Sequence, residues 1–86
     1  MVNSMIVVLR AHGMRFFIFV DDHEPPHVHV RGDGQAKVII VGRHGRPELD
    51  WSAGMNHSEK RRALQAIADA QAELLDHWRQ IHGERD

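Results

Sequence analysis

The stretch MRFFIFVDDHEPPHVHVRGDGQAKV (residues 14–38) holds two extended runs separated by a segment that cannot form regular secondary structure. Residues 14–20 are mostly aromatic or β-branched, which is typical of a β-strand. Residues 27–31 (HVHVR) alternate strictly, so the two valines point to one side of a strand and the two histidines and the arginine point to the other. Between the runs, Pro25 and Pro26 remove two backbone donors and fix two φ angles. The stretch therefore predicts a strand, a stiff loop and a second strand with a polar face.

Further strands are predicted over residues 5–10, 36–41 and 47–51, separated by turns that contain glycine. Residues 5–10 and the strand after them are apolar at consecutive positions, which predicts central or doubly covered strands. In residues 47–51, alternation puts Leu49 and Trp51 on one face.

One long helix is predicted at the C-terminal end. Asn56 and Glu59 fit a capping box at its start, and the pattern continues to about His82. The predicted buried face consists of Leu64, Ile67, Ala68, Gln71, Leu74, Leu75, Trp78 and Ile81. We therefore expect a single α+β domain over residues 1–86, with an antiparallel sheet of four to five strands and one long C-terminal helix packed on one face.

The composition is that of a small globular domain. The chain has 86 residues, of which 42% are hydrophobic and 27% charged, with a net charge of −1. This charge gives no overall attraction to nucleic acid or to a membrane. Cysteine is absent, which excludes disulfides and thiolate chemistry and suits a reducing cytoplasm. No apolar run reaches the roughly 20 residues that span a bilayer, so we expect a cytoplasmic protein without a membrane partner.

His23 to His27 spell H-E-x-x-H, the motif of the zinc proteases. In those enzymes the two histidines bind zinc from one face of a helix. Here both x positions are proline, and each would cost about 3 kcal/mol or more within a helix. The sequence therefore argues against a metalloprotease.

A different metal site stays open. His27 and His29 share a strand face, with Cβ atoms about 6–7 Å apart, and could chelate one ion with a third ligand. His23, Glu48 or Asp50 could supply that ligand. Such a set suits a divalent transition metal, and no other cofactor is indicated. The alternative is a purely structural segment, in which a rigid turn precedes a strand and its partly exposed histidines bind no metal ion.

These residues carry a family resemblance. Residues 14–38, together with the helical run SEKRRALQAIADAQAELLDHW (residues 58–78), closely resemble the small bacterial proteins called domain of unknown function 4160. The most specific part is the H-x-P-P-H-V-H core. The resemblance assigns the signature to Arg15, Phe16, Phe17, Asp22, His23, Pro25, Pro26, His27, His29, Gly32, Lys37 and Trp78.

The resemblance implies an uncharacterised component of a toxin–antitoxin type module, with a small partner protein encoded nearby. One hypothesis is an RNA-cleaving toxin, since histidine suits acid–base chemistry near neutral pH and cations bind phosphate. It assigns catalysis to His23, His27, His29 and Arg31. It assigns binding to Arg15, Asp22, Glu24 and Lys37, with His23, His27 and His29 as the metal ligands if a metal is used.

The alternative hypothesis is a non-enzymatic module. Such a protein would pair with its partner or with a second copy of itself, or would bind a metal through its histidines. The sequence leaves open whether the protein is an enzyme.

Overall fold

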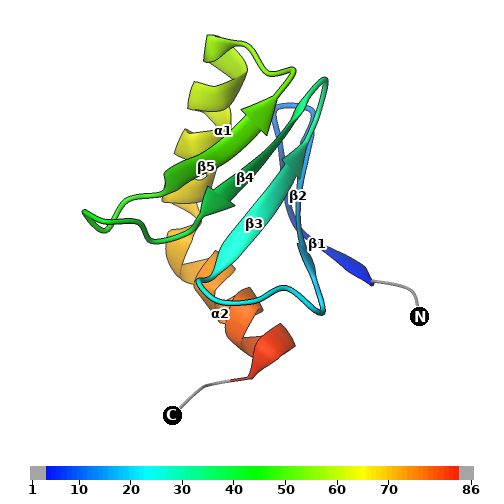
Figure 1. The fold of residues 1–86 in the computed structure, drawn as a ribbon, viewed down its shortest axis with the longest axis vertical. Helices are drawn as coiled ribbons and strands as arrows, with labels where there is room; N and C mark the ends of the chain where they lie inside the picture. The colour runs from blue at the N-terminus through cyan, green and yellow to red at the C-terminus, as the bar shows by residue number, and fades with distance from the viewer. Residues whose placement is uncertain (1–3, 84–86) are drawn as a thin grey trace.

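The computed structural model describes residues 4–83, which form five strands and two helices (Figure 1). The elements are β1 (Met5–Ala11), β2 (Met14–Phe19), β3 (His27–Arg31), β4 (Gln35–Ile39), β5 (Glu48–Ala53), α1 (His57–Asp69) and α2 (Gln71–His82). Each strand pairs antiparallel with the next along the chain, in the order β1-β2-β3-β4-β5. This arrangement confirms the predicted α+β class.

The predicted single long helix is wrong, because the helical segment divides at Ala70. The backbone of Ala70 has φ −114° and ψ 20°, outside the α-helical region. Next to it, Gln71 donates from Nε2 to the carbonyl oxygens of Ile40 (2.8 Å) and Gly45 (2.9 Å). These bonds tie the start of α2 to the β4–β5 connection, so a tertiary contact lies directly at the break.

The predicted start of the helix is confirmed. Asn56 Oδ1 accepts from the Glu59 N–H (2.8 Å), and Glu59 Oε1 accepts from the Asn56 N–H (2.9 Å), which completes the capping box. The observed buried face of the helices differs from the predicted one. Ala68, which was predicted to be buried, is exposed, and Ala63 and Ala66 are buried instead.

The prediction of a central position is wrong for β1, which is an edge strand paired with β2 alone in the described part of the chain. Met5 and Ile6 at its start are 46% and 37% exposed. Consecutive apolar residues therefore do not mark a doubly covered strand here, whereas β2 does have a neighbour on each side.

A β-bulge corrects the predicted faces of β5. Trp51 pairs with Lys37 and Leu49 pairs with Val38, so Asp50 is an extra residue between them. Leu49 consequently packs against the core, while Trp51 lies on the opposite face and is 44% exposed.

The hydrophobic core lies between the sheet and the two helices, which cover one face of the sheet (Figure 1). Its largest fully buried side chains are Phe16, Ile18, Val28, Val30, Val38, Ile40, Ile67 and Leu74. The alternation predicted for residues 27–31 is confirmed by the two valines in this core. Within the described residues, neither helix is long and apolar enough to cross a membrane.

The other side of the sheet, which we call the open face, is covered by neither helix of residues 4–83 (Figure 1). The side chains that strand register places on it include Arg10, Arg15, Phe17, Phe19, His29, Arg31, Lys37 and Trp51. His29 and Arg31 thus point away from the helices, as the alternation predicts, whereas His27 at the start of β3 packs against Trp78 of α2.

Candidate functional site

The β2–β3 connection carries the H-E-x-x-H letters but contains no helix. Its Glu24–Pro25 peptide bond is cis. The two histidines therefore do not share one helical face, and the geometry of a zinc protease is absent here.

Asp22 is held in place by the turn that leaves β2. Its N–H donates to the Phe19 carbonyl oxygen (3.1 Å), and its Oδ2 accepts from the Phe19 N–H (2.9 Å). These reciprocal bonds fix the carboxylate, whose side chain is 13% exposed, toward the start of β3.

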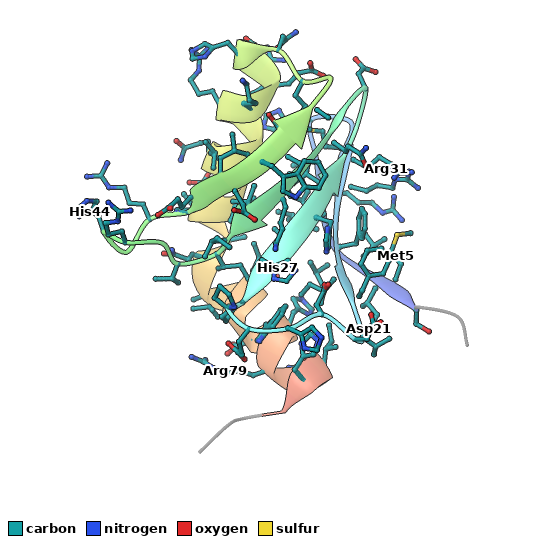
Figure 2. All side chains as sticks on the ribbon, viewed as in Figure 1. Met5, Asp21, His27, Arg31, His44 and Arg79 are labelled. Atoms are coloured by element: carbon teal, nitrogen blue, oxygen red, sulfur yellow. The ribbon has the colours of Figure 1, made fainter. Side chains whose placement is uncertain are left out.

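His27, which Figure 2 labels, is the first residue of β3. It is only 4% exposed. Its Nδ1 lies 2.9 Å from the carbonyl oxygen of Pro25. A carbonyl oxygen can only accept, so Nδ1 carries a hydrogen and the tautomer is set. The Trp78 ring of α2 packs on the imidazole, with centroids 5.2 Å apart. The ring is therefore fixed, with Nε2 facing Asp22.

His29 lies two residues further along β3. Its ring stacks on Phe17, with centroids 5.5 Å apart and an interplanar angle of 20°, and meets Phe19 edge-on at 4.9 Å. The side chain is 20% exposed, the most open of the three. Aromatic packing therefore holds His29 in position and leaves one side toward solvent.

The three side chains converge on one point. His27 Nε2 lies 3.4 Å from Asp22 Oδ1, and His29 Nε2 lies 3.2 Å from Asp22 Oδ2. All three donor atoms lie within 4.8 Å of one another. Ligand atoms around a tetrahedral zinc with bonds of about 2.0–2.1 Å are about 3.3 Å apart, so the spacing fits one ion.

The tautomer of His27 bears on how its Nε2 atom interacts with Asp22. Since Nδ1 carries the hydrogen, the Nε2 of a neutral His27 presents a lone pair to the Asp22 carboxylate. Two lone pairs at that distance repel each other. Either a second proton on His27 or a metal ion between the two atoms makes the contact attractive.

Burial raises the pKa of Asp22, but several groups lower it by more. The Phe19 N–H, the hydrogen bond with His29 and the charges of His27 and His29 favour the ionised carboxylate. The net pKa of Asp22 lies below its ordinary value of 3.8, so the site holds an anionic ligand near neutral pH.

His23 and Glu24 lie outside this cluster. His23 is exposed, and both residues line a cleft against α2 together with Trp78 and Arg79. Glu24 Oε2 accepts from the indole N–H of Trp78 (3.1 Å). Of the three histidines predicted as metal ligands, the structure brings together only His27 and His29.

The cations predicted to bind phosphate lie on the open face and not in the cluster. Lys37 pairs with Asp50 at 3.4 Å, which occupies one carboxylate that was a candidate third ligand. The other, Glu48, accepts from the Arg43 N–H (3.1 Å). The carboxylate that lies beside the two histidines is Asp22.

The sequence did contain a signal for Asp22. The spacing D-x4-H-x-H, with two prolines between the aspartate and the first histidine, allows the loop to turn back on the strand. The packing of Trp78 on His27 has no such signal, because 51 positions separate the two residues in the chain (78 − 27).

Comparison with known proteins is informative at the family level. Neither the curated proteins nor the solved structures contain a match to the chain. A family model matches residues 13–79, a segment that includes the Asp22, His27 and His29 cluster as well as the open face of β2 and β3. The chain therefore belongs to the family described as domain of unknown function (DUF4160).

Proposed function

We propose that this protein binds one transition-metal ion through Asp22, His27 and His29. The observation that carries the proposal is the approach of both Nε2 atoms to one ionised carboxylate, with the hydrogen of His27 held on its other nitrogen. Metal-binding histidines typically donate their second N–H to a carbonyl or carboxylate, as His27 does to Pro25.

Two histidines and one carboxylate form a set that suits iron(II), zinc, cobalt or nickel. Three protein ligands leave at least one coordination position for water or a substrate. The exposed side of His29 is where such a ligand would enter. The proposed centre is therefore an open one, suited to chemistry or to reversible binding.

Isothermal titration of the chelator-treated full chain with zinc and with cobalt(II) tests the proposal. We expect one ion per chain. The absorption spectrum of the cobalt(II) form should show a visible band typical of nitrogen and oxygen ligands. His29→Ala should weaken binding by more than about 100-fold, beyond the range typical of outer-shell changes.

The matched control is His23→Ala, since His23 lies in the same connection but outside the cluster. It should bind as the wild type does. Equal losses in His23→Ala and His29→Ala, or the absence of a stoichiometric ion, would refute the proposal.

RNA cleavage by a toxin of a toxin–antitoxin pair is the second proposal. It is supported by the open face, where Arg15 pairs across the strands with Arg31, and His29 lies two residues from Arg31. Because the His27 side chain is 5% exposed and that of His29 is 20% exposed, the accessible acid–base group would be His29.

A fluorogenic RNA assay tests this second proposal, with His27→Ala and His29→Ala beside the wild type. Cleavage that persists unchanged in both variants comes from a contaminating nuclease. A pull-down with the product of the neighbouring gene tests the pairing, and failure to bind would leave no support for the toxin–antitoxin part.

A further inference from the structure

Three arginines stand in one row across three neighbouring strands of the open face. Arg10 of β1 pairs with Arg15 of β2, and Arg15 pairs with Arg31 of β3. Directly paired residues have Cβ atoms about 4.5–5.5 Å apart. All three side chains are exposed, and Figure 2 shows Arg31 at the end of β3 remote from His27.

A β-bulge in β1 creates this row. Val7 pairs with Phe17 but Leu9 pairs with Phe16, so Val8 is an extra residue. Without it, the regular register would set Leu9 opposite Arg15 and turn Arg10 toward the helix-covered face. The bulge therefore adds the third cation to the open face.

The row is electrostatically unfavourable by itself. Like charges directly opposite each other destabilise a sheet. Within residues 4–83, none of the three guanidinium groups is in an ion pair, while Arg31 donates to the neutral amide of Gln35 (3.3 Å). An anionic ligand would relieve this repulsion.

The neighbouring row on the same face supplies an aromatic surface. It runs from Phe17 through His29 and Lys37 to Trp51, about 6.5–7 Å along the strands from the arginines. The indole of Trp51 is 44% exposed. A basic strip beside an exposed aromatic ring is the pattern that binds single-stranded nucleic acid, through phosphates and stacked bases.

We propose that the open face binds single-stranded nucleic acid, with phosphates on Arg10, Arg15 and Arg31 and a base on Trp51. A single strand fits better than a duplex, because the bases of a duplex are stacked and cannot pack on the indole. It also fits better than an acidic peptide, because carboxylates would contact the arginines but would not stack on Trp51. The proposal names a ligand class for the RNA-cleavage hypothesis, but it requires neither cleavage nor a metal.

Fluorescence anisotropy of the full chain in chelator tests it, with a short mixed-sequence oligonucleotide as DNA and as 2′-O-methyl RNA, which lacks the nucleophilic hydroxyl. Arg15→Gln and Arg31→Gln should each weaken binding. Each should also make the negative slope of log affinity against log salt shallower by about 0.7. Binding of either oligonucleotide supports the proposal, and the difference between the two shows whether the face prefers deoxyribose or 2′-O-methylribose.

Arg61→Gln is the matched control, since Arg61 is an exposed arginine of α1, and it should change neither affinity nor slope. Trp51→Ala should weaken binding at least about 5-fold. Trp51→Phe should retain most of the binding. A base stacked on Trp51 should quench the tryptophan fluorescence of the wild type, and Trp51→Phe should lose this quench. A folded chain that binds no strand, or arginine variants that bind unchanged, would overturn the proposal. Tighter, arginine-dependent binding of polyglutamate would assign the face to an acidic protein instead.

Discussion

At the residue scale, Asp22 organises the candidate site. It accepts from the Phe19 N–H and faces the Nε2 atoms of His27 and His29. Sequence reasoning assigned it to binding, but considered His23, Glu48 and Asp50 as the third metal ligand. The structure instead brings Asp22 beside the two histidines, because the β2–β3 connection turns back on β3.

Asp22→Asn should reduce stability in a pH-dependent way. The pKa of Asp22 is lower in the folded chain than the value of about 3.9 expected when unfolded, so the unfolded state binds more protons between the two values and stability rises with pH there. Its contribution is complete above about pH 5 and is lost as pH falls through the folded pKa.

Urea unfolding of the metal-free protein from about pH 6 downward measures this effect, and the deficit of Asp22→Asn should shrink below about pH 4. Asp21→Asn, at the exposed neighbouring position, is the control and should show no such trend. A deficit of Asp22→Asn that is constant with pH would contradict the assigned interactions.

Gly34 illustrates a second constraint at this scale. A Cβ added there would overlap the backbone of Gly54 and the carbonyl oxygen of Ala53. Because backbone cannot move aside cheaply, Gly34→Ala should lower the free energy of unfolding by at least about 2 kcal/mol. Gly45→Ala is the comparison, since its Cβ meets nothing within 4 Å and only its φ of +78° opposes the change. Denaturant unfolding should therefore show a smaller loss, about 1 kcal/mol, for Gly45→Ala.

At the element scale, the break at Ala70 and the bulges at Val8 and Asp50 position the functional surfaces. The bulges align Arg10 with Arg15 and turn Trp51 to the open face. Strand positions and helix capping follow from periodicity and local hydrogen bonding, and were predicted well. The bulges were not, because a bulge depends on which residue of the partner strand is opposite.

Gln71→Ala should destabilise the junction of the helices. Alanine is the better helix former, so intrinsic propensity favours the variant. The loss of two hydrogen bonds to Ile40 and Gly45 should nevertheless cost about 1–3 kcal/mol. Gln80→Ala, at an exposed position of α2, is the control and should be neutral or slightly stabilising in thermal unfolding. Equal behaviour of the two variants would mean that the Gln71 bonds do not hold the junction.

At the scale of the whole molecule, the cluster of Asp22, His27 and His29 joins the β2–β3 connection to the sheet, and the packing of Trp78 on His27 joins it to α2. A ligand bound there should stabilise the entire domain, since a domain of this size unfolds as one unit.

A bound metal should therefore raise the melting temperature. At 100 times its dissociation constant a ligand adds about 2.7 kcal/mol, which corresponds to about 10–20 °C for a domain of this length. Differential scanning fluorimetry with zinc, cobalt or nickel measures the shift. Magnesium is the control, because it prefers oxygen ligands and should produce no shift. A shift that remains in His29→Ala would mean that the metal binds elsewhere.

The sequence alone was enough to predict three features: the positions of the strands, the start of the helical segment and the alternation of β3. Side-chain period, capping and proline restriction act over a few neighbouring positions, so one chain is enough to infer them. The division of the helix, the edge position of β1, the row of arginines and the approach of Asp22 to the two histidines were not available in that way. They depend on pairing register and on contacts such as Gln71 with Ile40, which form only when distant parts of the chain pack together.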